Sequence, residues 1–193
     1  MIVLASASPR RQELLSSAGI SFVVQVAGVD ETPLTNESPQ SCAERLARNK
    51  AWAVFRDRPQ DFVLGADTIV VADNALLGKP LDAADAVRML GTLSGRTHQV
   101  ITGVCLMKPV ANAQGPAARE DIRSETTTVT MGELSDDDIA VYVSTGEPMD
   151  KAGAYAIQGL ASRWIPRIEG DYSNVVGLPV SLVYRMLREA GAL

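Results

Sequence analysis

The sequence predicts a single domain of the α/β class. Short apolar runs rich in β-branched residues, such as 2–5 and 62–71, alternate along the chain with segments whose apolar residues recur at helical spacing. A chain of 193 residues is long enough to bury about 70% of the surface that its unfolded form exposes, so it needs neither disulfides nor a metal to fold. We therefore expect one domain over residues 1–193, in one or two lobes.

Charge and cysteine content limit the classes of function. The formal net charge is −5 and the isoelectric point is about 4.9. These values argue against a dedicated binder of nucleic acid or of anionic membranes, because both ligands require a basic surface. Cys42 and Cys105 have neither CxxC nor metal-site spacing, which suits a reducing cytoplasm. The apolar run at the N-terminus is too short for a signal peptide or a membrane span, so we expect a cytoplasmic protein.

The N-terminal turn could bind an anion. The first strand-like run, 2–5, leads through small residues into a helix with Ser8 at the N-cap position and Pro9 at the first helical position. A helix N-terminus presents free backbone N–H groups to an anion, and Arg10 and Arg11 add donors suited to phosphate. Taken alone, the turn favours an ordinary capped helix with solvated arginines. The GxxxxGK[ST] spacing of a P-loop is absent.

The second predicted helix carries a lysine on its apolar face. A strand over 21–26 and a loop with Asp30 and Glu31 precede it. Loop carboxylates are usually solvated, although metal sites are often built from them. Ser38 is the expected N-cap. The apolar stripe of the helix consists of Ala43, Leu46, Ala47, Ala51 and Val54. Lys50 falls within this stripe and must extend its amine to water, pair with an acid or face an anion, and the first outcome is the commonest.

The stretch 62–80 is the most informative part of the sequence. Apolar, β-rich segments lie on both sides of Asp67, so its carboxylate is expected to be partly buried. Burying a carboxylate is unfavourable unless a cation, a metal or several hydrogen bonds compensate it. Asp67 is therefore either a structural acceptor or a working acid, base or metal ligand, and burial alone supports both about equally. Gly65 and Ala66 favour the second interpretation, because small side chains let a ligand approach the backbone.

A hairpin and a helix are expected after this strand. Asp73-Asn74 is a turn signal, and if 75–77 pairs back on the strand, Lys79 returns toward the Asp67 end. Asp82 is the expected N-cap of the next helix. The apolar face of that helix is expected to consist of Ala83, Ala86, Val87 and Leu90.

Two long strands are predicted in the middle of the chain, over 96–107 and 120–131. The segment 109–119, rich in Ala, Pro and Gly, is expected to join them as an extended hairpin loop without chemistry. His98 is the only histidine, and no Cys, Asp or Glu lies at a metal-ligand spacing from it. We therefore expect His98 to have a hydrogen-bonded structural role, and a lone histidine weakens any interpretation as a catalytic triad.

The last third of the chain alternates helices with glycine-rich segments. Ser135 and Asp138 form a capping-box-like helix start. The segments 150–159 and 168–179 are dense in glycine and polar residues, which is typical of loops that line a cleft. Pro179 is expected to open the final helix.

Taken together, the charged residues suit hydrolysis of a phosphoanhydride. Glu31 and Asp67 offer oxygen ligands of the kind that Mg²⁺ prefers. Cationic side chains that could neutralise phosphates are Arg10, Arg11, Lys50 and Lys79. A metal and cations would stabilise the negative charge that spreads during this reaction. On spacing alone, this function is a hypothesis.

Seven short motifs occur in order over nearly the whole chain. They are Ser6-Ala7-Ser8-Pro9-Arg10-Arg11, Val29-Asp30-Glu31, Gly65-Ala66-Asp67-Thr68, Gly78-Lys79-Pro80, Ser94-Gly95-Arg96-Thr97-His98, Asp150-Lys151-Ala152-Gly153 and Gly177-Leu178-Pro179. As a set they resemble the Maf family of nucleoside triphosphate pyrophosphatases. The resemblance implies a mixed α/β fold similar to inosine triphosphate pyrophosphatases, with a long curved sheet flanked by helices and two lobes around a cleft. It also implies a homodimer and cleavage between the α and β phosphates, dependent on Mg²⁺ or Mn²⁺, to a nucleoside monophosphate and pyrophosphate.

The resemblance also implies roles for individual residues. Asp67 matches the acceptor of the proton from the attacking water and, with Glu31, is expected at the metal. The residues expected at the phosphates are Ser8, Arg11, Lys50 and Lys79. Arg10, Thr68 and Gln158 resemble the group that hydrolyses dTTP and UTP, whereas the 7-methyl-GTP group carries a tryptophan at the Arg10 position.

Two alternatives to a dTTP and UTP pyrophosphatase are open. Within the same class, the substrate could be another or a modified nucleotide, such as a modified pyrimidine or 7-methyl-GTP. From a different class, the association of the family with arrested septation suggests a non-catalytic nucleotide-binding regulator of septum formation. Retention of Glu31, Asp67 and Lys79 favours the enzyme.

Overall fold

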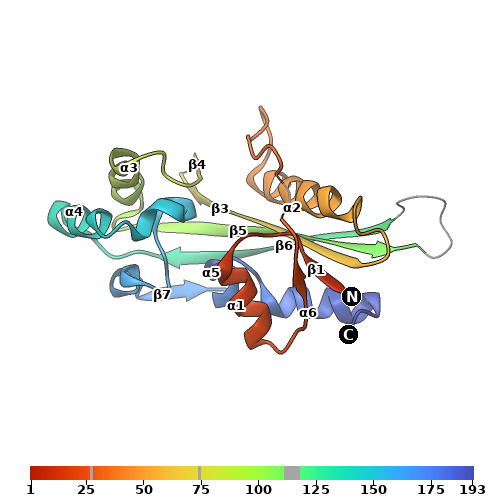
Figure 1. Cartoon of the computed structure of the whole chain (residues 1–193). Coiled ribbons are helices and arrows are strands. Elements are labelled where there is room, and N and C mark those ends of the chain that lie inside the picture. Colours follow the sequence, from red (N-terminus) through yellow and green to blue (C-terminus); the bar gives the residue numbers. More distant parts are fainter. Residues whose placement is uncertain (27, 74, 111–117) are drawn as a thin grey trace. The chain divides into compact units, whose positions relative to one another are not determined.

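The structure, a computed structural model, describes residues 1–26, 28–73, 75–110 and 118–193. Over these residues the fold is mixed α/β, with a seven-stranded sheet in the order β2-β1-β3-β5-β6-β7 and with β4 paired to β3 beside this path (Figure 1). β1 pairs in parallel with β2 and β3, whereas β4 and β7 pair antiparallel with β3 and β6. The predicted α/β class is confirmed.

The elements have the following bounds. The strands are β1 (Ile2–Leu4), β2 (Val23–Val24), β3 (Phe62–Ala72), β4 (Ala75–Leu77), β5 (Thr97–Pro109), β6 (Ala118–Thr130) and β7 (Arg167–Glu169). The helices are α1 (Pro9–Ser17), α2 (Pro39–Phe55), α3 (Ala83–Leu93), α4 (Asp136–Ser144), α5 (Tyr172–Val176) and α6 (Val180–Ala190), with 3-10 helices η1 (Glu147–Asp150), η2 (Ala152–Ala154) and η3 (Leu160–Trp164). Within the described ranges, every helix is too short or too polar to cross a membrane.

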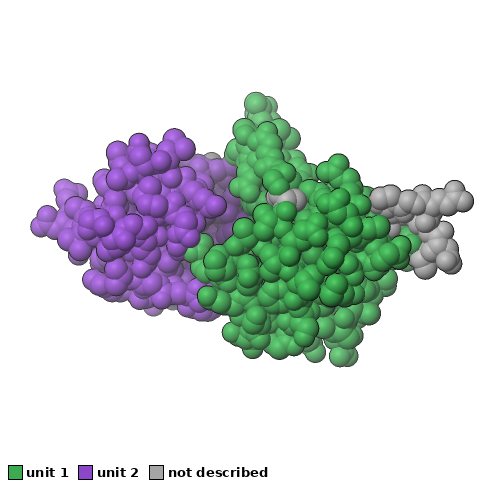
Figure 2. All heavy atoms as spheres, viewed as in Figure 1, with its two compact units in different colours: residues 1–67, 102–125, 177–193 green, residues 68–101, 126–176 purple. Residues whose placement is uncertain are grey.

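The chain divides into two compact units (Figure 2). Unit 1 consists of residues 1–67, 102–125 and 177–193, and unit 2 of residues 68–101 and 126–176. The strands β3, β5 and β6 each contribute residues to both units.

Helices cover both faces of the strands in unit 1. Alternate residues of a strand point to opposite faces. Ile2 and Leu4 of β1 therefore pack on the side of α1 and α6, whereas Val3 packs on the side of α2 (Figure 1). Because both faces are covered, β1 and the first part of β3 read as continuous apolar runs in the sequence.

Two glycines let α2 approach the strands of unit 1 closely. A Cβ atom on Gly65 of β3 would lie 2.2 Å from the carbonyl oxygen of Ala47, and one on Gly103 of β5 would lie 2.3 Å from that of Ala43. Real side chains do not tolerate such distances, so these positions exclude every residue except glycine unless α2 moves. The small residues of the predicted α2 stripe are thus in contact with strand backbone.

Most of the predicted helix N-caps are confirmed. The Ser38 side chain accepts a hydrogen bond from the Ser41 N–H, and Asp82 accepts one from Asp85. Ser135 and Asp138 form a full capping box at α4. At α1, Ser8 occupies the N-cap position before Pro9 but makes no capping bond with its side chain. The N–H of Ser8 instead donates to the Ser6 hydroxyl at 3.2 Å.

The core of unit 2 is built on α3 and corrects the predicted face of that helix. Its buried residues are Ala86, Met89, Leu90 and Leu93. Ala83 is exposed and Val87 is 43% exposed, so their predicted burial was wrong. The two sets overlap at Ala86 and Leu90, and both have helical spacing. Packing against α4 and the strands selects the set with the two larger side chains, Met89 and Leu93.

Some segments predicted to be loops contain regular structure. The segment 150–159 contains η2 and the end of η1, and 168–179 contains part of β7 and all of α5, so the prediction of loops was wrong in these parts. These elements are only three to five residues long, too short for a recognisable period. The predicted strands over 96–107 and 120–131 are confirmed as β5 and β6. Asn74 of the predicted turn and residues 111–117 of the predicted 109–119 loop lie outside the described residues.

His98 has the structural role that the sequence predicts. Its side chain is buried in unit 2, at 3% exposure, and its Nε2 lies 2.8 Å from the Tyr155 hydroxyl. The two rings pack edge to face with their centroids 5.3 Å apart. Burial lowers the pKa of His98 from 6.5 to about 4, so the imidazole is neutral in the folded protein at neutral pH.

We expect this buried imidazole to make stability dependent on pH. Because its pKa is lower in the folded than in the unfolded state, its contribution is complete above about pH 6.5 and is lost as the pH falls toward 4. The total loss should be roughly 3 kcal/mol. Urea unfolding between pH 7 and pH 4 should therefore show a shallower decline for His98→Gln than for the unchanged protein. The acidic residues titrate in both proteins and so contribute equally to the decline. If the free energy of unfolding declined equally with pH in both proteins, the pH dependence could not be assigned to His98.

Candidate functional site

Asp67 lies on β3 and faces α2. Val63 packs on the α2 side of the sheet and Gly65 contacts α2, so strand alternation directs Asp67 to that side as well. The residue is 7% exposed, which confirms the predicted partial burial. A carboxylate in this position requires a compensating cation or hydrogen-bond donors.

Lys50 of α2 supplies that cation. Its Nζ lies 2.6 Å from Oδ1 of Asp67 and 2.6 Å from Oε1 of Glu31. Of the three outcomes that the sequence left open for Lys50, the structure shows pairing with acids and not the commonest one, extension of the amine to water. The reason is the close contact of α2 with the strands, which places the amine next to Asp67. The Lys50 and Asp67 side chains are only 13% and 9% exposed, whereas that of Glu31 is 54% exposed.

The two predicted metal ligands converge on one point. Glu31 and Asp67 each have a carboxylate oxygen 2.6 Å from the same nitrogen. In the described part of the chain there is no group of three or more His, Cys, Asp or Glu suited to a metal. Two carboxylates fit Mg²⁺, which commonly uses one or two and completes its coordination with water and substrate phosphates. The residues therefore fit a metal that binds together with a phosphorylated substrate.

Arg11 connects three segments of unit 1. Its Nε donates to the carbonyl oxygen of Gly177 at 2.8 Å, and its Nη1 donates to the carbonyl oxygen of Ala66 at 2.9 Å and to the Ser6 hydroxyl at 3.2 Å. Arg11 is 8% exposed. Burial lowers the pKa of its guanidinium, and the Asp67 carboxylate opposes this shift. Arg11 thus fixes the backbone directly before Asp67.

This anchoring role of Arg11 was not among the predictions from the sequence. One signal was available, because Arg11 lies four residues before Leu15 and therefore on the buried face of α1. Its expected role at the phosphates stays a prediction. Ser8 and Arg10, at the N-terminus of α1, are half-buried. Their expected roles at the phosphates and at the base also stay predictions.

The other predicted site residues belong to unit 2. The hairpin is confirmed, since Val70 pairs with Leu77, and the chain therefore returns along β3 toward Thr68. Thr68 is half-buried, and Lys79 and Gln158 are exposed. Two of the sequence motifs meet in this unit, because the N–H of Gly153 donates to the carbonyl oxygen of Gly78 at 3.0 Å.

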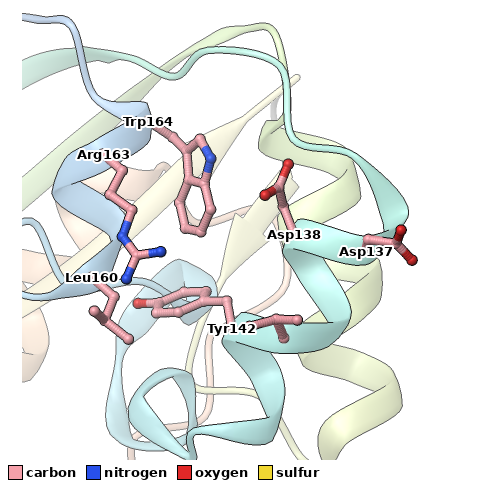
Figure 3. A pocket seen from close by; sticks show the side chains of 7 residues that line it. Asp137, Asp138, Tyr142, Leu160, Arg163 and Trp164 are labelled. Atoms are coloured by element: carbon pink, nitrogen blue, oxygen red, sulfur yellow. The ribbon is translucent and has the colours of Figure 1, made fainter.

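A small pocket of about 150 Å³ lies elsewhere in unit 2 (Figure 3). It is lined by Asp137, Asp138, Val141, Tyr142, Leu160, Arg163 and Trp164. The Tyr142 and Trp164 rings form its aromatic part, with centroids 5.6 Å apart, and the Arg163 guanidinium lies 5.8 Å from the centre of the Trp164 ring. None of the predicted site residues lines this pocket.

Comparison of the structure with known proteins gives the fold class, and comparison of the sequence gives the family. A HAM1 protein from Coxiella burnetii has a similar structure, with a TM-score of 0.51 and 19% identity over 97% of this chain and 98% of that chain. At this identity the likeness shows a shared fold. A family model described as Maf-like protein matches residues 1–190.

Two full-length relatives agree with the family match. A dTTP/UTP pyrophosphatase of Koribacter versatilis is 57% identical over 100% of this chain and 95% of its own length. Another, from Symbiobacterium thermophilum, is 53% identical over 98% of this chain and 94% of its own length. The chain belongs to the Maf family, as the sequence motifs indicated.

We expect the pair between Lys50 and Asp67 to be strongly coupled. Lys50→Met should lower the free energy of unfolding by about 3 kcal/mol, because it leaves a buried carboxylate without its cation. Adding Asp67→Asn should restore part of this loss, with a coupling of at least about 1 kcal/mol in a double-mutant cycle. Urea unfolding measures each term. Lys79→Met is the matched control, since Lys79 is exposed, and should change stability by less than about 0.5 kcal/mol. Additive effects of the two substitutions would refute the coupling.

Proposed function

We propose that this protein hydrolyses dTTP and UTP to the nucleoside monophosphate and pyrophosphate. The observation that carries the proposal is the convergence of Asp67, Lys50 and Glu31 in a chain 57% identical to a protein named dTTP/UTP pyrophosphatase. A buried carboxylate at the end of an apolar strand segment, held by an amine from a packed helix, is suited to general base catalysis.

In this proposal Asp67 accepts a proton from the attacking water. The water oxygen forms a bond to the α-phosphorus, the bond from the α-phosphorus to the bridging oxygen of the β-phosphate breaks, and pyrophosphate leaves. Lys50 fixes the orientation of the Asp67 carboxylate through its 2.6 Å contact. Arg11 supports the same geometry, because it binds the carbonyl oxygen of Ala66. Both contacts hold the base in place before the substrate arrives.

Glu31 and Asp67 would hold a divalent cation, Mg²⁺ or Mn²⁺, together with the substrate phosphates. When bound, this cation would neutralise negative charge on the triphosphate. We assign Ser8, Arg11, Lys50 and Lys79 to phosphate binding. Cationic groups are necessary there, since the chain as a whole has a net charge of −5 and would otherwise repel the substrate.

We assign recognition of the base to Arg10, Thr68 and Gln158. An arginine, a hydroxyl and an amide together provide donors and an acceptor for the edge of a pyrimidine. The names of two relatives support this choice of substrate, because both are called dTTP/UTP pyrophosphatase. A homodimer in the cytoplasm completes the proposal.

The substitution Asp67→Asn tests the proposed role of Asp67 as general base. The measurement is pyrophosphate release from a panel of nucleotides. Release from dTTP and UTP should fall by about 10²- to 10⁴-fold, the usual contribution of a general base. Binding of dTTP, measured by calorimetry, should persist. Asp57→Asn is the matched control, because Asp57 is exposed in the same unit, and should leave release unchanged.

Other outcomes of this panel would overturn parts of the proposal. Orthophosphate as the direct product would overturn the choice of bond. Activity confined to 7-methyl-GTP would overturn the choice of substrate. Nucleotide binding without any turnover by the unchanged protein would favour the non-catalytic regulator.

We expect removal of divalent cations with EDTA to abolish pyrophosphate release and Mg²⁺ or Mn²⁺ to restore it. Glu31→Gln should raise the Mg²⁺ concentration for half-maximal activity by at least about tenfold, because loss of groups that only orient a metal ligand already has this effect. Asp30→Asn is the control, since the Asp30 carboxylate accepts from the N–H and the hydroxyl of Thr32. An equal metal requirement in Glu31→Gln and the unchanged protein would exclude Glu31 as a ligand.

A further inference from the structure

The turn that carries Gln158 is held by two side chains that have no part in the function proposed above. The turn closes through a hydrogen bond of 3.0 Å from the N–H of Gly159 to the carbonyl oxygen of Ala156. The Gln158 side chain is exposed. Its position therefore depends on how firmly the backbone on either side is fixed.

Tyr142 and Glu147 fix both ends of this turn. The Tyr142 hydroxyl accepts from the N–H of Ala156 at 3.1 Å and donates to Oε1 of Glu147 at 2.8 Å. The same Oε1 accepts from the N–H of Leu160 at 3.1 Å. One phenol and one carboxylate thus bind the backbone two residues before and two residues after Gln158.

The carboxylate of Glu147 also lies directly against Gly159. A Cβ atom at this position would be 2.3 Å from Oε1 and 2.6 Å from Oε2 of Glu147. The φ angle of Gly159 is −104°, which any residue can adopt, so space alone requires glycine here. The contact shows that Glu147 packs on the turn as well as binding it.

The two residues of this contact are themselves held by packing and by a hydrogen bond. Tyr142 is 1% exposed and packs edge to face on Trp164. Burial raises the pKa of Tyr142, so its hydroxyl remains protonated and can donate to Glu147. The N–H of Glu147 in turn donates to the Thr145 hydroxyl at 3.2 Å.

We propose that Glu147, together with Tyr142, positions Gln158 to read the base of the substrate. An amide donates and accepts, so a fixed Gln158 can pair with an imide edge, in which a ring N–H lies beside a carbonyl oxygen. Uracil and thymine have this edge. Cytosine has a ring nitrogen acceptor beside an amino group in its place and pairs only with the flipped amide, so selection requires that the turn hold Gln158 with its amide in the first orientation. Glu147 is thus a positioning residue for selection of imide-bearing pyrimidines. The inference rests on the proposed function, since it takes Gln158 as a contact of the base.

The test compares kcat/KM for dTTP with kcat/KM for dCTP, using pyrophosphate release. Gln158→Ala should lower this ratio, and Glu147→Ala should lower it by about tenfold, the effect of one misplaced hydrogen bond. Glu147→Gln should keep the ratio within about threefold of the unchanged protein, because its amide oxygen can replace Oε1 as an acceptor. Unfolding by urea, measured in parallel, identifies any variant that fails to fold. If Glu147→Ala does not fold, Tyr142→Phe takes its place and should also lower the ratio, because it removes the hydroxyl that binds Glu147 and Ala156.

A second pair of variants tests the contact itself. Gly159→Ala should lower the ratio through collision with the carboxylate, but in the Glu147→Ala background the same change should have little further effect. Gly132→Ala is the matched control, because its new Cβ would lie 3.5 Å from its nearest neighbour, an ordinary contact.

The results separate the two levels of the inference. A ratio lowered by Gln158→Ala but unchanged by Glu147→Ala, Gly159→Ala and Tyr142→Phe would overturn the positioning role alone. A ratio unchanged by Gln158→Ala would overturn it together with the assignment of Gln158 to the base. A loss of stability with an unchanged ratio would show that Glu147 supports only the fold.

Discussion

The contact between α2 and the backbone of β3 and β5 is the constraint on which the candidate site depends. Gly65 and Gly103 have no Cβ atoms, and the helix therefore lies close enough for Lys50 to reach Asp67. With a larger residue at either glycine, the helix would have to move outward by about 1 Å, because a Cβ atom there would lie 2.2 or 2.3 Å from its backbone and ordinary contact begins at 3.4 Å. A hydrogen-bonded ion pair of 2.6 Å does not tolerate such a shift.

The charges at the site balance one another. Asp67 and Glu31 both contact the Lys50 amine, and the Arg11 guanidinium also interacts electrostatically with the two carboxylates. This matters because an unpaired charge in a buried position costs several kcal/mol. The arrangement has an asymmetry that suits a triphosphate. Asp67 is buried and fixed, whereas Glu31 lies on an exposed loop and can adjust to a metal and its substrate.

Four of the described glycines make room for a neighbouring group. Gly65 and Gly103 admit a helix, and Gly159 admits a carboxylate, although its own φ angle would allow any residue. Gly153 combines both requirements, since its φ is +70° and a Cβ would lie 3.0 Å from the side chain of Val70. In all four positions the neighbour lies at least 12 residues away in the sequence. A glycine can therefore indicate close packing between separate elements as well as the flexibility of a loop.

The sequence by itself determined the five longer helices, the long strands, three of the helix caps, the hairpin and the burial of Asp67. These features follow from interactions between residues close in the chain. The local composition and the spacing of apolar residues reveal such interactions. Only the tertiary structure decided which acid Lys50 meets, that Arg11 is buried, and that Glu147 lies against Gly159. Each of these depends on the distance between elements far apart in the sequence. That distance is set by side-chain packing in the folded protein, and a local sequence pattern carries no information about it.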